Sequence, residues 1–155
     1  MPAEICRRCN AVEECYEFML AYAAQGVSSG DASQSGGRIR EVLQQAVDAL
    51  SGLADACRTA IRADALDSAE KYIAFLDVLD RDAHDSMRTI ELVLAQPAIS
   101  SQLIDNLNAS MHLRAVLTDL FLVSDIARIA RTSPTRLVEA NSNTKSNTEK
   151  QHDYA

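Results

Sequence analysis

The chain has 155 residues, 47% hydrophobic and 24% charged, which is the composition of one globular domain with its own core. Its formal net charge is −7 and its basic residues lie between acidic ones, which argues against nucleic acid or an anionic membrane surface as a partner. No apolar run reaches the roughly 18 to 20 residues of a membrane-spanning helix, and the N-terminus lacks the order of a signal peptide, so we expect a cytoplasmic protein. Alanine and leucine are abundant and aromatic residues make up only 5%, which favours an all-α fold.

The first predicted helix covers about residues 3–25. Its apolar positions recur at intervals of three and four, the spacing of one helix face: Ile5, Cys9, Val12, Tyr16, Met19 and Ala23. The sequence GVSSGDASQSGG follows over residues 26–37 and holds four of the five glycines, so we expect a long flexible loop there.

Three further helices are predicted, over about residues 38–63, 67–96 and 99–130. The second and third repeat the helical spacing of apolar residues, and Pro97 separates the third from the fourth. From Leu113 onward the fourth segment is apolar around most of its circumference. Such a helix is buried on more than one side, so we expect a partner to cover part of it, through Leu122, Ile126 and Ile129.

These segments predict an antiparallel four-helix bundle as a single domain over residues 1–131. A three-helix core with one helix docked on a partner is the alternative. The sequence after Ser133 and Pro134 is polar and without period, which predicts a disordered polar tail over residues 132–155.

The four cysteines are the main candidates for chemistry. Counting residues from the turns places Cys6 and Cys9 at the same end of the bundle as Cys57. Thiolates at this spacing suit zinc or another thiophilic metal, and two facing thiols could instead form a redox pair. The third interpretation is that Cys9 and Cys57 fill the core while Cys6 and Cys15 flank it, because free cysteine is among the most buried residue types.

Two histidines extend the metal hypothesis. His84 lies 13 residues before Pro97 and His112 lies 15 after it. If the two helices are antiparallel neighbours, the two histidines therefore lie at nearly the same height along the bundle. Asp80 precedes His84 by one turn and could orient its imidazole or share a metal. Both histidines sit beside the apolar face of their helices, which favours exposed side chains over inward-pointing ligands.

No combination of nucleophile, base and orienting group occurs at a convincing spacing, so we do not expect an enzyme or a bound cofactor. The sequence favours a non-catalytic interaction module, an adaptor, accessory or assembly factor or regulator, that binds a protein partner or a second copy of itself. The alternative is a metal- or thiol-dependent sensor or carrier that uses Cys6, Cys9 and Cys57, with Cys15, His84 and His112 as further candidate ligands.

Overall fold

A computed structural model describes residues 3–28, 30, 32–63 and 69–132, with the side chains of 32–36, 69 and 127–132 left out. The described residues are helical or connect helices, and they contain no strand, so the chain is all-α. The helices are α1 (Ala3–Ala24), α2 (Ala32–Leu50), α3 (Leu53–Ala63), α4 (Ala69–Leu94), α5 (Ser101–Ala109) and α6 (His112–Thr132). The predicted tail, residues 132–155, lies almost entirely outside the described residues.

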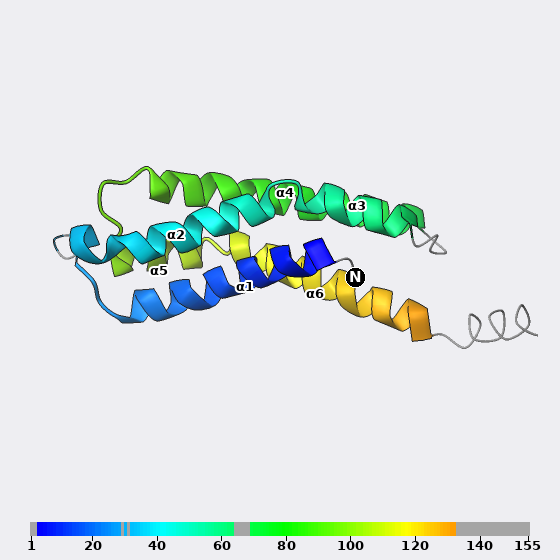
Figure 1. Cartoon of the computed structure of the whole chain (residues 1–155), viewed down its shortest axis with the longest axis horizontal. Helices are drawn as coiled ribbons and strands as arrows, with labels where there is room; N and C mark the ends of the chain where they lie inside the picture. Colours follow the sequence, from blue (N-terminus) through cyan, green and yellow to red (C-terminus); the bar gives the residue numbers. More distant parts are fainter. Residues whose placement is uncertain (1–2, 29, 31, 64–68, 133–155) are drawn as a thin grey trace, which may run out of the picture. The chain divides into compact units, whose positions relative to one another are not determined.

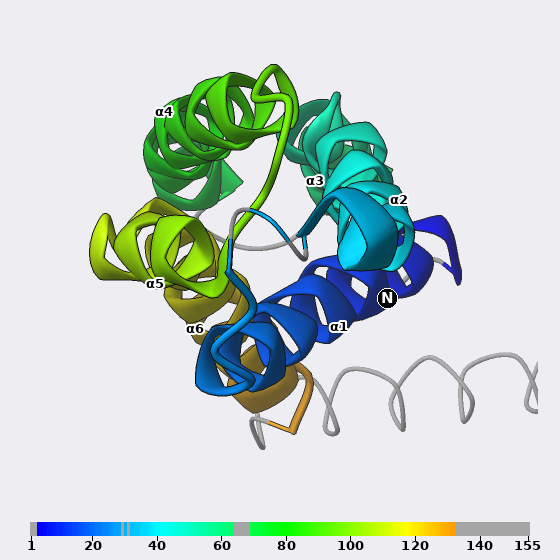
Figure 2. The same ribbon diagram turned by 90° about the vertical axis from the view of Figure 1, so that its left-hand side faces the viewer.

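The chain divides into two compact units, residues 1–120 and 121–155. In the first unit α1 packs against α2 and α5, and α4 packs against α2, α3 and α5. The end-on view shows α1, α2, α4 and α5 surrounding a shared interior (Figure 2). Large apolar side chains that are less than 2% exposed fill that interior, among them Met19, Leu43, Leu76 and Ile104.

Two of the four predicted helices are each broken in two, which corrects the sequence prediction. The segment predicted over 38–63 is interrupted at Ser51 and Gly52 between α2 and α3 (Figure 1). Gly52 has a φ of 73°, a left-handed conformation that glycine adopts without steric cost and that commonly ends a helix.

The second break, at Ser110 and Met111, divides the segment predicted over 99–130 into α5 and α6. Met111 has a φ of 65°, which a residue with a Cβ adopts at a cost of roughly 1–2 kcal/mol. No glycine or proline marks this break, so nothing in the local sequence announces it.

The long loop predicted over 26–37 is also shorter than expected, because α2 already begins at Ala32. Once residues 38–50 are helical, each residue added to the helix gains a hydrogen bond, whereas a helical glycine costs only about 1 kcal/mol. The Gly36-Gly37 pair therefore does not stop the helix.

The buried face of α1 contains Ile5, Val12 and Met19 as predicted and differs from the predicted face at single positions. Its buried residues also include Cys15 and Tyr22, while their predicted neighbours Tyr16 and Ala23 are only half-buried. In α4 the fully buried residues include the polar Ser86. The predicted intervals hold in both helices, but adjacent apolar residues left the exact direction of each face open.

Arginine side chains join the helices of the first unit at their ends. Arg8 of α1 donates to the main-chain oxygens of Asp48, Ala49 and Ser51, which lie at the end of α2. Arg58 of α3 donates to the carboxylate of Asp77 on α4 at 2.8 Å. These guanidinium groups satisfy helix carbonyls that have no partner within their own helix, or link two helices directly.

None of the described helices combines the length and the apolar character needed to cross a lipid bilayer.

Candidate interaction surface and the predicted cysteine and histidine sites

The apolar residues of α6 divide into a buried set and an exposed set. Leu113, Val116, Leu117 and Leu120 are buried in the first unit. In the second unit, Phe121, Leu122 and Ile126 are 53%, 46% and 42% exposed. We call these three residues the apolar α6 patch.

The helical spacing explains why two of these residues lie together. Leu122 and Ile126 are four residues apart and therefore neighbours on one face, whereas Phe121 points about 100° away from Leu122 around the helix. Monomeric proteins expose single apolar side chains routinely, and large contiguous apolar patches are the ones that mark interaction sites. The patch brings three large, partly exposed apolar side chains close together along α6.

Two of the three residues predicted to bind a partner, Leu122 and Ile126, lie in this patch. The third, Ile129, belongs to α6, but its side chain is outside the described residues. Phe121, another apolar residue of the predicted fourth helix, is also exposed. Leu120 and Phe121 are adjacent and point about 100° apart on a helix, so they cannot both face the same core. That geometry could have indicated from the sequence that one of the two is exposed.

The predicted cysteine site combines an exposed, a half-buried and a buried thiol. Cys6 is exposed, Cys9 half-buried and Cys57 buried, and all four cysteines of the chain are free thiols. Burial, followed by the nearby charges of Cys57 and Cys6, raises the pKa of Cys9 to about 11. Burial also raises the pKa of Cys57, although Arg58 and Arg8 oppose it.

These pKa directions describe the chemistry open to the two inner thiols. Cys9 lies on α1 and Cys57 on α3, and these two helices are in contact. Metal ligation and nucleophilic attack require the thiolate, which a raised pKa disfavours at neutral pH. Cys9 and Cys57 therefore behave as protonated, packed thiols in the free protein.

Cys15 occupies the core, which corrects the prediction that it flanks it. Its side chain is fully buried, its sulfur lies 3.7 Å from the sulfur of Met19, and burial raises its pKa to about 12. This position separates Cys15 from any role at the surface.

His84 has the exposure that its position predicted, whereas His112 is less exposed than predicted. His84 is exposed, and its Nδ1 donates to the main-chain oxygen of Asp80 at 2.7 Å, with the Asp80 carboxylate 3.5 Å away. His112 is half-buried at the first position of α6. Across the described residues, no three His, Cys, Asp or Glu side chains are grouped in a way that could hold a metal ion.

The first unit also contains a carboxyl pair that the sequence did not indicate. Asp119 of α6 has a pKa raised to about 6, first by burial and then by the charge and hydrogen bonding of Asp82 on α4. The Oδ2 atom of Asp119 is buried and makes no hydrogen bond to the described residues. The raised pKa favours the protonated form of Asp119 at mildly acidic pH.

Comparisons with protein-family models, curated proteins and solved structures gave no significant match for this chain.

Proposed function

We propose that this chain is a non-catalytic interaction module, an adaptor, accessory or assembly factor or regulator, that binds another helix through the apolar α6 patch. The observation that carries the proposal is the exposure of Phe121, Leu122 and Ile126 on neighbouring turns of one helix. A second amphipathic helix fits such a surface because its own side chains at intervals of three and four can pack between these residues.

The partner to which we commit first is a second copy of the chain. Two identical helix faces can pair about a twofold axis, so that each patch covers the other. Three half-exposed side chains per copy offer too little apolar area for a tight complex. We therefore expect weak self-association that increases with protein concentration.

Sedimentation velocity over a range of protein concentrations tests this proposal. We expect the natural chain to shift from monomer toward dimer, and the double variant Leu122→Glu, Ile126→Glu to remain monomeric, because charged side chains cannot be buried unpaired. Leu92→Glu is the matched control, since Leu92 is 66% exposed on α4, outside the patch, and should leave association unchanged.

Circular dichroism separates loss of association from loss of fold. Both variants should keep the helical spectrum of the natural chain, because each replaced side chain is already exposed. A natural chain that stays monomeric at every concentration, or a double variant that dimerises normally, contradicts the proposal.

We interpret the helix arrangement as the antiparallel four-helix bundle expected from the sequence, with α2 and α3 counted as one helix and α5 and α6 as another. The packing of α1 on α2 and α5, and of α4 on α2, α3 and α5, supports this interpretation for residues 3–120.

The second candidate function is a metal- or thiol-dependent sensor or carrier that uses Cys6, Cys9 and Cys57. Its support is that Cys9 lies close enough to Cys6 and Cys57 for the charges of both to raise its pKa. A thiophilic metal would have to displace the protons of the two inner thiols, so its binding would depend on pH.

A further inference from the structure

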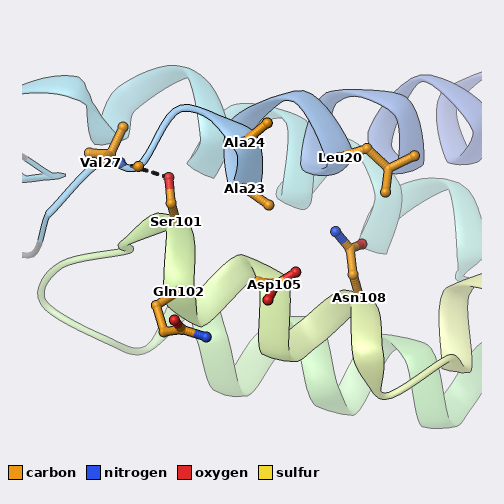
Figure 3. Close-up of a pocket in the computed structure, with 9 residues that line it drawn as sticks. Leu20, Ala23, Ala24, Val27, Ser101, Gln102, Asp105 and Asn108 are labelled. Atoms are coloured by element: carbon orange, nitrogen blue, oxygen red, sulfur yellow. Dashed lines mark hydrogen bonds between the residues drawn. The ribbon is translucent and has the colours of Figure 1, made fainter.

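A pocket of about 570 Å³ lies between the second half of α1 and α5, far along the chain from the apolar α6 patch. Its α1 side, which includes the turn that follows the helix, is lined by small or apolar residues. Its α5 side is lined by polar residues (Figure 3). The lining residues are Leu20, Ala23, Ala24, Gly26, Val27, Ser101, Gln102, Asp105 and Asn108. The pocket has the size typical of sites for small molecules.

One end of the pocket is fixed by hydrogen bonds. The hydroxyl of Ser101 donates to the main-chain oxygen of Tyr22 at 2.6 Å and accepts from the main-chain N–H of Val27 at 2.8 Å. The N–H of Ser101 donates in turn to the oxygen of Val27 at 3.0 Å. These bonds hold the start of α5 against the end of α1, so the pocket is formed before any ligand arrives.

Asn108 lies at the other end and has polar atoms without partners. Its side chain extends from α5 toward α1, beside Leu20 (Figure 3). Both its Nδ2 and its Oδ1 are buried and make no hydrogen bond to the described residues. Leaving a buried carboxamide unpaired is unfavourable, and a group that both donates and accepts a hydrogen bond would satisfy it when the side chain turns into the pocket.

Asp105 precedes Asn108 by one helical turn and gives the pocket its charge. It is the one ionisable side chain among the lining residues, and it is exposed to solvent. Residues three apart on a helix are neighbours, with Cβ atoms about 5–6 Å apart, so one small ligand can reach both side chains. A positive charge on that ligand would complement Asp105.

We propose that this pocket binds a small primary ammonium compound that also carries an amide group and an aliphatic side chain. The ammonium group pairs with Asp105, the amide donates to and accepts from Asn108, and the aliphatic part lies against Leu20 and Ala23. The proposal is independent of the α6 interaction, because none of these residues belongs to the apolar α6 patch.

Leucinamide is the probe, and three close relatives test each part of the proposal on the natural chain. Binding is followed by the shifts of backbone amide signals in two-dimensional NMR, at a mildly acidic pH where the amine is protonated. We expect a dissociation constant on the order of 1 mM for a ligand of this size. N-acetyl-leucinamide lacks the charge, 3-methylbutylamine lacks the amide and leucine carries a carboxylate in its place, so each should bind several-fold more weakly.

Variants locate the site. Asn108→Leu should weaken leucinamide binding at least tenfold, and Asp105→Asn several-fold. Asn10→Leu and Asp85→Asn make the same chemical changes at exposed positions on α1 and α4, outside the pocket, and should bind as the natural chain does.

Three results would overturn the proposal. These are the absence of shifts at Val27, Gln102 and Asp105 with leucinamide well above millimolar concentration, equal binding of N-acetyl-leucinamide, and undiminished binding by Asn108→Leu. If Asn108→Leu fails to fold, the comparison of the four ligands on the natural chain still decides the question.

Discussion

Arg40 of α2 closes the carboxyl end of α4, because its Nη1 donates a hydrogen bond of 2.7 Å to the main-chain oxygen of Leu94. Its Nη2 donates to the oxygen of Gln96, which follows the helix. The last carbonyls of a helix have no hydrogen-bond partner within it. A charged donor forms a stronger hydrogen bond to them than a neutral donor does. This one side chain therefore fixes the position of α4 against α2.

We expect Arg40→Met to lower the free energy of unfolding by about 1.5–3 kcal/mol, the usual effect of losing hydrogen bonds from a charged group. Arg38→Met is the matched control. Arg38 is exposed and pairs only with Glu41 among the described contacts, so its loss should cost less than about 0.5 kcal/mol. Urea unfolding measures the stability of both variants. Equal losses of unfolding free energy would show that the hydrogen bonds from Arg40 to the end of α4 add no stability.

The carboxyl pair of Asp82 and Asp119 predicts how stability depends on pH. The pKa of Asp119 is raised to about 6 in the folded protein, against about 3.9 for an unfolded aspartate. The folded state therefore binds a proton that the unfolded state has released between about pH 4 and pH 6, so this group's contribution to stability is lost as the pH rises through that range.

Asp119→Asn removes this loss, because the amide cannot ionise and can still donate a hydrogen bond to Asp82. Above pH 6 the variant should be more stable than the natural chain by about 1 kcal/mol, a value reduced from the full shift because the carboxyl is partly solvated. The difference should disappear below about pH 4. Thermal unfolding across this range tests the prediction, and a pH-independent difference would contradict it.

The break between α5 and α6 predicts a stabilising substitution at Met111. Its φ of 65° suits glycine, so Met111→Gly should raise the free energy of unfolding by about 1 kcal/mol once the flexibility of unfolded glycine is subtracted. Met111→Ala keeps the Cβ and should change stability little, since the Met111 side chain is 57% exposed. If alanine stabilises as much as glycine, backbone strain is not the cause.

The thiol environments predict the order in which the cysteines react. Cys6 is exposed, whereas burial raises the pKa of Cys9 to about 11 and that of Cys15 to about 12. Because the thiolate is the reactive form, iodoacetamide near neutral pH should modify Cys6 first and Cys15 last. Mass spectrometry of tryptic peptides over time gives the order, and Cys9 reacting as fast as Cys6 would contradict it.

The same labelling with added zinc tests the alternative function. If the chain is an interaction module, zinc should leave the labelling rates of Cys6, Cys9 and Cys57 unchanged. Joint protection of the three by zinc would favour the metal-dependent sensor or carrier.

The regular helices were predictable because their apolar residues recur at helical intervals, and α1 and α4 match residues 3–25 and 67–96 to within two or three residues at each described end. The break at Gly52 was also visible in principle, since an isolated glycine within a helical pattern often ends a helix. The break at Met111 was not, because Met111 adopts a left-handed conformation that methionine does not favour.

The candidate surfaces were predictable only in part. The apolar circumference of α6 indicated that some of it lies outside the core, and Leu122 and Ile126 are indeed exposed. The α1–α5 pocket could not be predicted, because it depends on how closely two helices approach and on which carboxamide their packing leaves unpaired. Sequence periodicity gives the face of a helix and carries no information about such distances.

Photo-crosslinking from position 121 tests the central proposal, binding through the apolar α6 patch, most directly. Phe121 is replaced by benzoylphenylalanine, which retains an aromatic ring at an exposed position, and Leu92 by the same residue as a control. The account predicts a crosslinked product of twice the chain mass from position 121, with the crosslink in α6 of the second copy, and none from position 92. No crosslinked dimer from position 121, or an equal yield from position 92, would contradict it.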